Sequence, residues 1–171
     1  FKMNKEGIKF FDENISRRNE ITDRKIIFFK DSDIPMPSIF EISNSGMCNR
    51  KCSFCPRSDP AYKHANEFIS QKLHDKIYEE LSANNFSGSI IFSGFAEPLL
   101  DKRIYKQIQD IREKLPKANI ELITNGDPLN QERIEKLFDS GLSYLLVSAY
   151  DSEKQANDFR DLLSKTNVDS S

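Results

Sequence analysis

The sequence predicts an α/β fold in which one parallel sheet is built from repeated βα units. Two observations lead to this prediction. From residue 39 onward, four short apolar runs alternate with four amphipathic helical patterns, which is typical of parallel strands joined by right-handed crossovers. Cysteine, glycine, proline and small polar residues follow directly after the apolar runs. That is the edge where parallel sheets and barrels place their active sites.

The first unit begins with a predicted strand at residues 39–43, which leads straight into a loop that contains three cysteines. The helix that follows is expected to bury Leu73, Ile77 and Leu81 on one face. Ser70 stands where an N-cap is expected. His74 falls on the polar side of this helical pattern, so we expect its side chain to be exposed to solvent.

The second and third units repeat this order, with predicted strands at 90–93 and 120–124. Apolar residues at helical spacing mark the two helices that follow: Ile104, Ile108, Ile111, Leu115, Ile134, Leu137 and Phe138. Asp101 and Asn130 are the expected N-caps of these helices. Gly141 suits the position just after the third helix, where a left-handed backbone is common.

The fourth unit has a predicted strand at 144–148 and a helix through Ala156, Phe159 and Leu163, with Asp151 as the expected cap. The strand is apolar enough to be covered on both faces, yet it would be the open edge of the sheet. Because open apolar edges aggregate, we expect a further strand to pair with it.

Residues 1–38 differ from the repeated units. Residues 26–29 form an apolar patch, and two prolines within residues 31–37 interrupt regular structure. We therefore predict an N-terminal extension at 1–38 that packs on a core of residues 39–171.

Cys48, Cys52 and Cys55 are the only cysteines of the chain, and all lie within eight residues. Inert buried thiols are seldom grouped in this way. An odd count in a chain of this size argues against a disulfide framework. Three thiolates can hold an iron–sulfur cluster that has one iron free of protein ligands, since four cysteines are the usual set. The alternative is a zinc site of the Cys3His type that includes His64.

The C-x3-C-x2-C spacing, with Phe54 just before the last cysteine, resembles the cluster loop of radical S-adenosylmethionine (radical SAM) enzymes. Residues 93–98 resemble the Gly-Glu-Pro segment that these enzymes carry after the second strand. By this resemblance, Cys48, Cys52 and Cys55 hold a [4Fe–4S] cluster. It also implies that the core is part of a (β/α)6 partial TIM barrel, of which this chain has the first four units.

The resemblance also implies how S-adenosylmethionine is bound. It places Phe54 near the adenine, and the backbone around Gly94 and Ala96, together with Glu97, at the amino group. Ala96 departs from the subgroup pattern, which has glycine there, and a Cβ at that position is unfavourable where the backbone needs positive φ or close approach. Further expected contacts come from Thr124, Asn125 and Ser148 at the ends of strands three and four.

The activity implied by the resemblance is reductive cleavage of S-adenosylmethionine to a 5′-deoxyadenosyl radical. This radical then abstracts hydrogen from a peptide or small-molecule substrate. Such an enzyme needs an external one-electron donor of the flavodoxin or ferredoxin type. The segment at 93–98 is similar to the subgroup with SPASM or Twitch extensions, and the six-unit barrel implies at least two more units beyond residue 171. A non-catalytic iron–sulfur electron carrier or a zinc-stabilised binding domain is the alternative.

Composition excludes several other classes. A net charge of −2 and a pI near 5.8 argue against nucleic acid or an anionic membrane as the main partner. No apolar run approaches the ~20 residues that a membrane-spanning helix needs. No signal peptide is recognisable, and clustered metal-ready thiols suit a reducing compartment, so we predict a cytoplasmic location.

Overall fold

The computed structural model describes residues 26–168 of the chain. Four parallel strands form one sheet in the order β1-β2-β3-β4, so each strand pairs with its neighbours in sequence. The strands are β1 (Ile39–Ile42), β2 (Ser89–Phe92), β3 (Asn119–Thr124) and β4 (Tyr144–Val147). This confirms the predicted parallel α/β fold, and the sequential strand order is that of a barrel segment.

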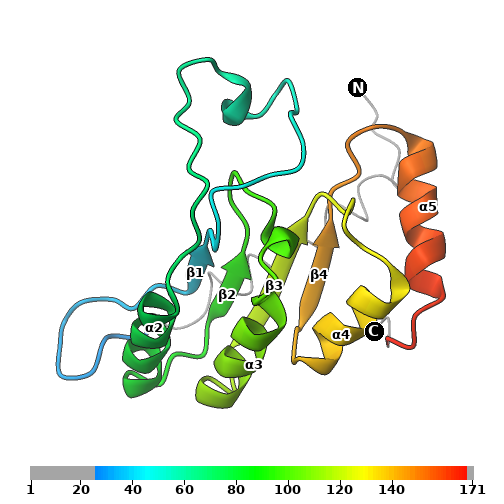
Figure 1. The fold of residues 1–171 in the computed structure, drawn as a ribbon. Coiled ribbons are helices and arrows are strands. Elements are labelled where there is room, and N and C mark those ends of the chain that lie inside the picture. Colours follow the sequence, from blue (N-terminus) through cyan, green and yellow to red (C-terminus); the bar gives the residue numbers. More distant parts are fainter. Residues whose placement is uncertain (1–25, 169–171) are drawn as a thin grey trace, which may run out of the picture.

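The crossover helices are α2 (Gln71–Ala83), α3 (Ile104–Lys114) and α4 (Gln131–Asp139), and α5 (Glu153–Ser164) follows β4. Figure 1 shows α2, α3 and α4 side by side in front of the sheet, and each helix contacts the next one in the sequence. Two short 3-10 helices, η1 (Pro56–Ser58) and η2 (Pro98–Leu100), lie in the loops after β1 and β2.

The core lies between the helices and one face of the sheet. Strand residues on that face are buried in register across the sheet: Ile42, Ile90, Phe92, Ile120 and Leu122. Side chains alternate between faces along a strand, so intervening residues such as Glu41 and Glu121 point to the other side. Ser93 at the end of β2 donates to Glu41 Oε1 at 2.6 Å on that opposite side. The sheet therefore has one apolar face and one mixed face.

The face predicted for α2 was partly right, because Leu81 is buried and Ile77 packs against the core, but Leu73 and His74 were assigned to the wrong sides. Leu73 is 46% exposed, whereas His74, Tyr78 and Leu81 are buried. His74 lies within the fold because its Nδ1 meets the Tyr78 hydroxyl at 2.8 Å, which provides a polar partner inside the protein. Burial, together with nearby Arg103, lowers the pKa of His74.

The lowered pKa of His74 predicts an acid-sensitive fold. The unfolded chain takes up a proton near the ordinary histidine pKa of about 6.5, before the folded protein does, so the stability contributed by neutral His74 declines as pH falls below that value. We expect His74→Phe to flatten the slope between pH 7 and pH 5 by up to about 1.4 kcal/mol per pH unit. Urea unfolding of the apoprotein measures this. An unchanged slope in His74→Phe would contradict this expectation.

Helix caps were predicted correctly where the cap is local. Ser70 accepts from the Leu73 N–H, and Asn130 accepts from the Arg133 N–H. Gly141 follows α4 with φ +103°, as expected of a residue in that position.

Two other predicted caps were wrong. Asp101 is not the N-cap of α3, because Arg103 holds that position; the Asp101 carboxylate accepts from the Arg103 N–H at 3.0 Å and from the side chains of Arg103 and Gln107. Ser152, and not Asp151, caps α5 by accepting from the Gln155 N–H. The carboxylate of Asp151 is instead engaged by Arg50 from the cysteine loop.

Residues 26–38 lie before β1. Met36 is buried in the core and Phe29 packs against it, whereas Ile26, Ile27 and Phe28 are exposed. The first 25 residues of the predicted extension lie outside the described residues, so the division at residue 38 stays a prediction. Within residues 26–168, no helix combines the length and the apolar character needed to span a bilayer. The predicted cytoplasmic location and the expected lack of nucleic-acid and membrane partners also stay predictions.

Candidate functional site

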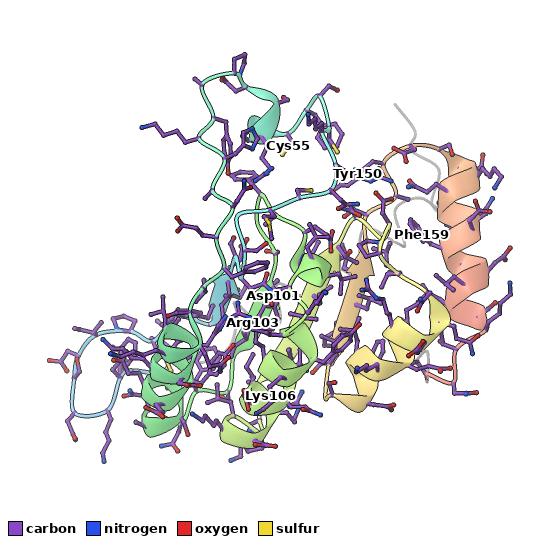
Figure 2. All side chains as sticks on the ribbon, viewed as in Figure 1. Cys55, Asp101, Arg103, Lys106, Tyr150 and Phe159 are labelled. Atoms are coloured by element: carbon purple, nitrogen blue, oxygen red, sulfur yellow. The ribbon has the colours of Figure 1, made fainter. Side chains whose placement is uncertain are left out.

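The candidate site lies at the carboxyl end of the sheet. Figure 1 shows the long loop between β1 and α2, which carries the cysteines, rising beyond the strand tips at that end. In Figure 2, Cys55 lies in this loop, and Tyr150, from the segment after β4, lies close to the same end of the molecule. The parallel sheet therefore brings the predicted site segments to one edge, as the sequence indicated.

The three thiols are free and half-buried. The loop is compact around them: the Cys55 N–H donates to the Cys52 carbonyl at 3.0 Å, and the Arg50 N–H lies 3.4 Å from Cys48 Sγ. Among residues 26–168, no three His, Cys, Asp or Glu side chains are grouped closely enough to hold one metal ion. In a [4Fe–4S] cluster each thiolate binds a different iron, so its cysteines need not converge on one point. Three thiols in one loop therefore fit the donor set of such a cluster.

Asn125, directly after β3, connects the cysteine loop to the sheet. Its Nδ2 donates to Asn49 Oδ1 at 2.8 Å and lies 3.9 Å from Cys48 Sγ. The segment predicted to wall the site is thus in contact with a predicted cluster ligand. Backbone contacts reinforce this, because the Glu97 N–H donates to the Met47 carbonyl at 2.7 Å.

Gly94 and Ala96 have different roles in the loop after β2. Gly94 has φ +107°, and a Cβ there would lie 2.0 Å from Ser43 Oγ, so both its backbone and the space around it require glycine. Ala96 is not among the residues with positive φ in the described part of the chain. The backbone therefore does not require glycine at position 96, and the departure from the family pattern costs no left-handed strain.

We predict that Gly94→Ala lowers the free energy of unfolding by about 1–3 kcal/mol, because it places a side chain in a backbone region that only glycine adopts freely. Ala96→Gly is the matched control and should cost less than about 1 kcal/mol. Urea unfolding of the two apoproteins provides the measurement. Equal losses in both variants would contradict the assignment.

Glu97 is almost fully buried, with 1% of its surface exposed. Its Oε1 accepts from the Thr124 hydroxyl at 2.7 Å and from the Leu99 N–H at 3.1 Å, and its Oε2 accepts from the Asn125 N–H at 2.9 Å. Burial raises the pKa of Glu97, and these three hydrogen bonds only partly offset the effect. Within residues 26–168, no Lys, Arg or His forms an ion pair with it. The site thus holds a buried acceptor that lacks a cationic partner of its own.

Two exposed aromatic residues meet beside the cysteines. The rings of Phe54 and Tyr150 have centroids 5.2 Å apart and are tilted by 52°. Phe54 is 68% exposed, so its ring offers a free face for a flat ligand. Ser148, at the end of β4, is half-buried and donates its N–H to the Thr124 carbonyl at 2.9 Å.

The partners of Arg50 were not predicted from the sequence. This side chain binds Asp127, after β3, and Asp151, after β4, and its hydrogen bonds to both carboxylates raise its own pKa and lower that of Asp127. Asn49 Nδ2 also donates to Asp127 at 2.9 Å. The sequence positions of these residues could have indicated the contact, because both aspartates closely follow strand ends and Arg50 lies between two cysteines.

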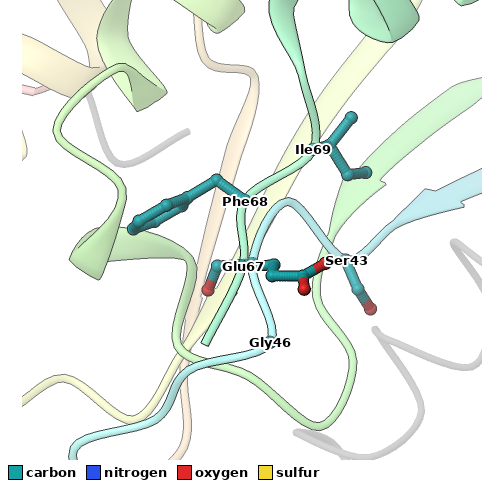
Figure 3. A pocket seen from close by; sticks show the side chains of 6 residues that line it. Ser43, Gly46, Glu67, Phe68 and Ile69 are labelled. Carbon is teal, nitrogen blue, oxygen red and sulfur yellow. The ribbon is translucent and has the colours of Figure 1, made fainter. Parts of the chain in front are cut away.

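A hollow of about 310 Å³ lies next to the cysteine loop (Figure 3). Its walls are Ser43, Ser45 and Gly46 before the loop and residues 67–69 after it, and no cysteine lines it. Arg57 secures this part of the loop by donating to the carbonyls of Gly46 and Phe95. The hollow is thus separate from the thiols.

Comparison with known proteins agrees with the site. The sequence profile of the family described as "Radical SAM superfamily" matches residues 42–169. The chain belongs to the radical SAM superfamily, whose members use a [4Fe–4S] cluster and S-adenosylmethionine.

One similar curated protein is the S-adenosyl-L-methionine-dependent 2-deoxy-scyllo-inosamine dehydrogenase of Niallia circulans. It is 32% identical over 117 residues, which cover 68% of this chain and 46% of the relative. The chain therefore spans about half the length of this relative.

Two solved structures are also similar. BtrN in complex with AdoMet and 2-DOIA superposes with a TM-score of 0.68 at 28% identity, over 76% of this chain and 52% of that one. Selenomethionine BtrN in an open conformation gives 0.62 at 28% identity, over 70% and 53% of the two chains. These likenesses confirm that the four βα units belong to a radical SAM partial barrel.

Proposed function

We propose that this chain is the cofactor-binding part of a radical SAM enzyme that abstracts a hydrogen atom from a small-molecule substrate. The observation that supports this most is the contact between the cysteine loop and the loops after β2 and β3. Met47 meets Glu97 through the backbone, and Asn125 reaches both Asn49 and Cys48. An electron carrier or a zinc-binding domain has no need for these loops beside its metal.

Cys48, Cys52 and Cys55 would hold the cluster. When bound, the cluster supplies the electron that cleaves S-adenosylmethionine into methionine and a 5′-deoxyadenosyl radical. The chain binds and orients the reactants, whereas the difficult chemistry belongs to the cofactor. Phe54, with its exposed ring, would cover the adenine, and Ser148 and Asn125 would offer polar groups to the cofactor.

Glu97 would receive the amino group of S-adenosylmethionine. Its Oε2 accepts one hydrogen bond within the protein, so this oxygen retains capacity for a second donor. A bound ammonium would supply the positive charge that the buried carboxylate lacks, and the resulting charge-assisted hydrogen bond is of the strong kind. The protein hydrogen bonds to Thr124 and Asn125 fix the carboxylate in place beforehand.

The relative named as a dehydrogenase suggests that the substrate is an alcohol on a small ring. Oxidation of an alcohol to a ketone removes two electrons and two protons. One electron and one proton leave together as the hydrogen atom taken by the radical. The second proton goes to a base, and the second electron goes to a one-electron acceptor such as an auxiliary iron–sulfur cluster. Since all three cysteines of this sequence are assigned, such a cluster would need ligands from elsewhere.

The test is anaerobic reconstitution with iron and sulfide, followed by S-adenosylmethionine and dithionite. We expect 5′-deoxyadenosine and methionine in equal amounts, with faster turnover when aminocyclitols or related alcohols are added. A cluster that forms but yields no 5′-deoxyadenosine would identify an electron carrier. Stoichiometric zinc without sulfide would identify the zinc-binding alternative.

A further inference from the structure

We propose that Arg50 is a positioning residue that fastens the cysteine loop to the ends of β3 and β4 and thereby retains the cluster. The inference rests on the proposed function, because it takes the cysteine loop to be the cluster loop. The observation behind the inference is independent of the thiols, because it concerns hydrogen bonds of the Arg50 side chain.

The guanidinium of Arg50 binds two carboxylates at once. Its Nε and Nη2 donate to Asp127 at 2.7 and 2.5 Å, and its Nη1 and Nη2 donate to Asp151, each at 2.9 Å. The Arg50 side chain is only 15% exposed. A planar fork that grips two carboxylates fixes orientation as well as distance, which a lysine ammonium does not do.

These contacts join three loops that are far apart in sequence. Arg50 is 77 residues from Asp127 and 101 residues from Asp151. The neighbouring residue Asn49 also donates to Asp127, and it accepts a hydrogen bond from Asn125 Nδ2. The stretch between Cys48 and Cys52 is therefore secured from both β3 and β4.

The arrangement has two expected effects on a bound cluster. First, Arg50 holds the cysteine loop in its conformation. Removal of a residue that orients metal ligands typically lowers metal affinity by about 10- to 100-fold. Second, Arg50 offsets two negative charges near the thiolates. Without it, both carboxylates remain uncompensated, and reduction of the cluster becomes less favourable.

The experiment compares Arg50→Gln, Arg50→Lys and Lys51→Gln in the anaerobically purified holoprotein. Lys51 is the matched control because it is exposed, adjacent, and equally charged. We expect iron loss to a chelator to be about 10- to 100-fold faster in both Arg50 variants and unchanged in Lys51→Gln. The midpoint potential should become more negative in Arg50→Gln and stay near the wild-type value in Arg50→Lys, which keeps the charge but not the fork.

Hydrogen exchange on the apoprotein separates this inference from the proposed function. Amides of residues 48–55 should exchange faster in Arg50→Gln than in Lys51→Gln, whether or not iron binds. If the wild-type protein holds no cluster, the proposed function fails. Hydrogen exchange of the apoprotein still tests whether Arg50 fastens the cysteine loop. If Arg50→Gln does not fold by circular dichroism, Asp151→Asn, at an exposed partner, carries the same test. Unchanged exchange and unchanged iron loss would overturn the inference.

Discussion

Replacement of Cys48, Cys52 or Cys55 by Ala is expected to abolish the iron–sulfur cluster. The sequence contains no other cysteine that could substitute, and the three thiols lie in one loop. A cluster with two remaining protein ligands would not survive purification, so the loss should be nearly complete. Visible absorption, iron and acid-labile sulfide, measured without oxygen, provide the test.

Ser53→Ala is the control for this prediction, because it alters the same loop without removing a ligand. It should keep its iron and sulfide. The unfolding midpoint of each apoprotein is compared with that of the wild type. An unchanged midpoint shows that a cysteine variant has lost a cluster ligand and has kept its fold. Full iron content in any of the three variants would contradict the ligand assignment.

Glu97→Gln is expected to weaken S-adenosylmethionine binding by about 10- to 100-fold, with the cluster retained. A charge-assisted hydrogen bond contributes roughly 1.5–3 kcal/mol, and the amide loses the charge. In addition, its NH2 group replaces one carboxylate oxygen and cannot accept the bond made there now, from the Leu99 N–H or from the Asn125 N–H. Equilibrium binding to the reconstituted protein measures the affinity, and Glu67→Gln, at an exposed glutamate, is the control.

The pH dependence of binding gives a second test of Glu97. A bound ammonium favours the ionised carboxylate, whereas burial raises its pKa in the free protein. Affinity should therefore fall as pH is lowered through that raised pKa, because protonation removes the charge that the ammonium contacts. The fall should be absent in Glu97→Gln. Identical pH profiles in the two proteins would show that the amino group is held by other residues.

The order of βα units was predictable because it depends on local periodicity. Strand bounds agree with the structure to within one residue, and Ser70 and Asn130 cap their helices by contacts three residues away. The convergence of site segments at one edge also followed from the sequence, since parallel strands all point the same way.

The errors arose where a distant partner decided the outcome. Asp151 is well placed to cap a helix, but Arg50, 101 residues away in sequence, takes its carboxylate. His74 looked polar and therefore exposed, yet it is buried, and the Tyr78 hydroxyl gives its Nδ1 a partner within the core. Periodicity fixes the pitch of a helix more firmly than its phase, so a shift of one residue exchanged Leu73 for His74.

The long sequence separation between the cysteine loop and its supports has a consequence for assembly. The chain is synthesised from its amino end, so the three thiols emerge well before β3 and β4. Iron delivered to the nascent loop would find the ligands without Asn125, Asp127 or Asp151 beside them. On the fastening role that we propose for Arg50, stable insertion of the cluster would wait for formation of the fourth strand, so that maturation of the metal centre would report on completion of this part of the fold.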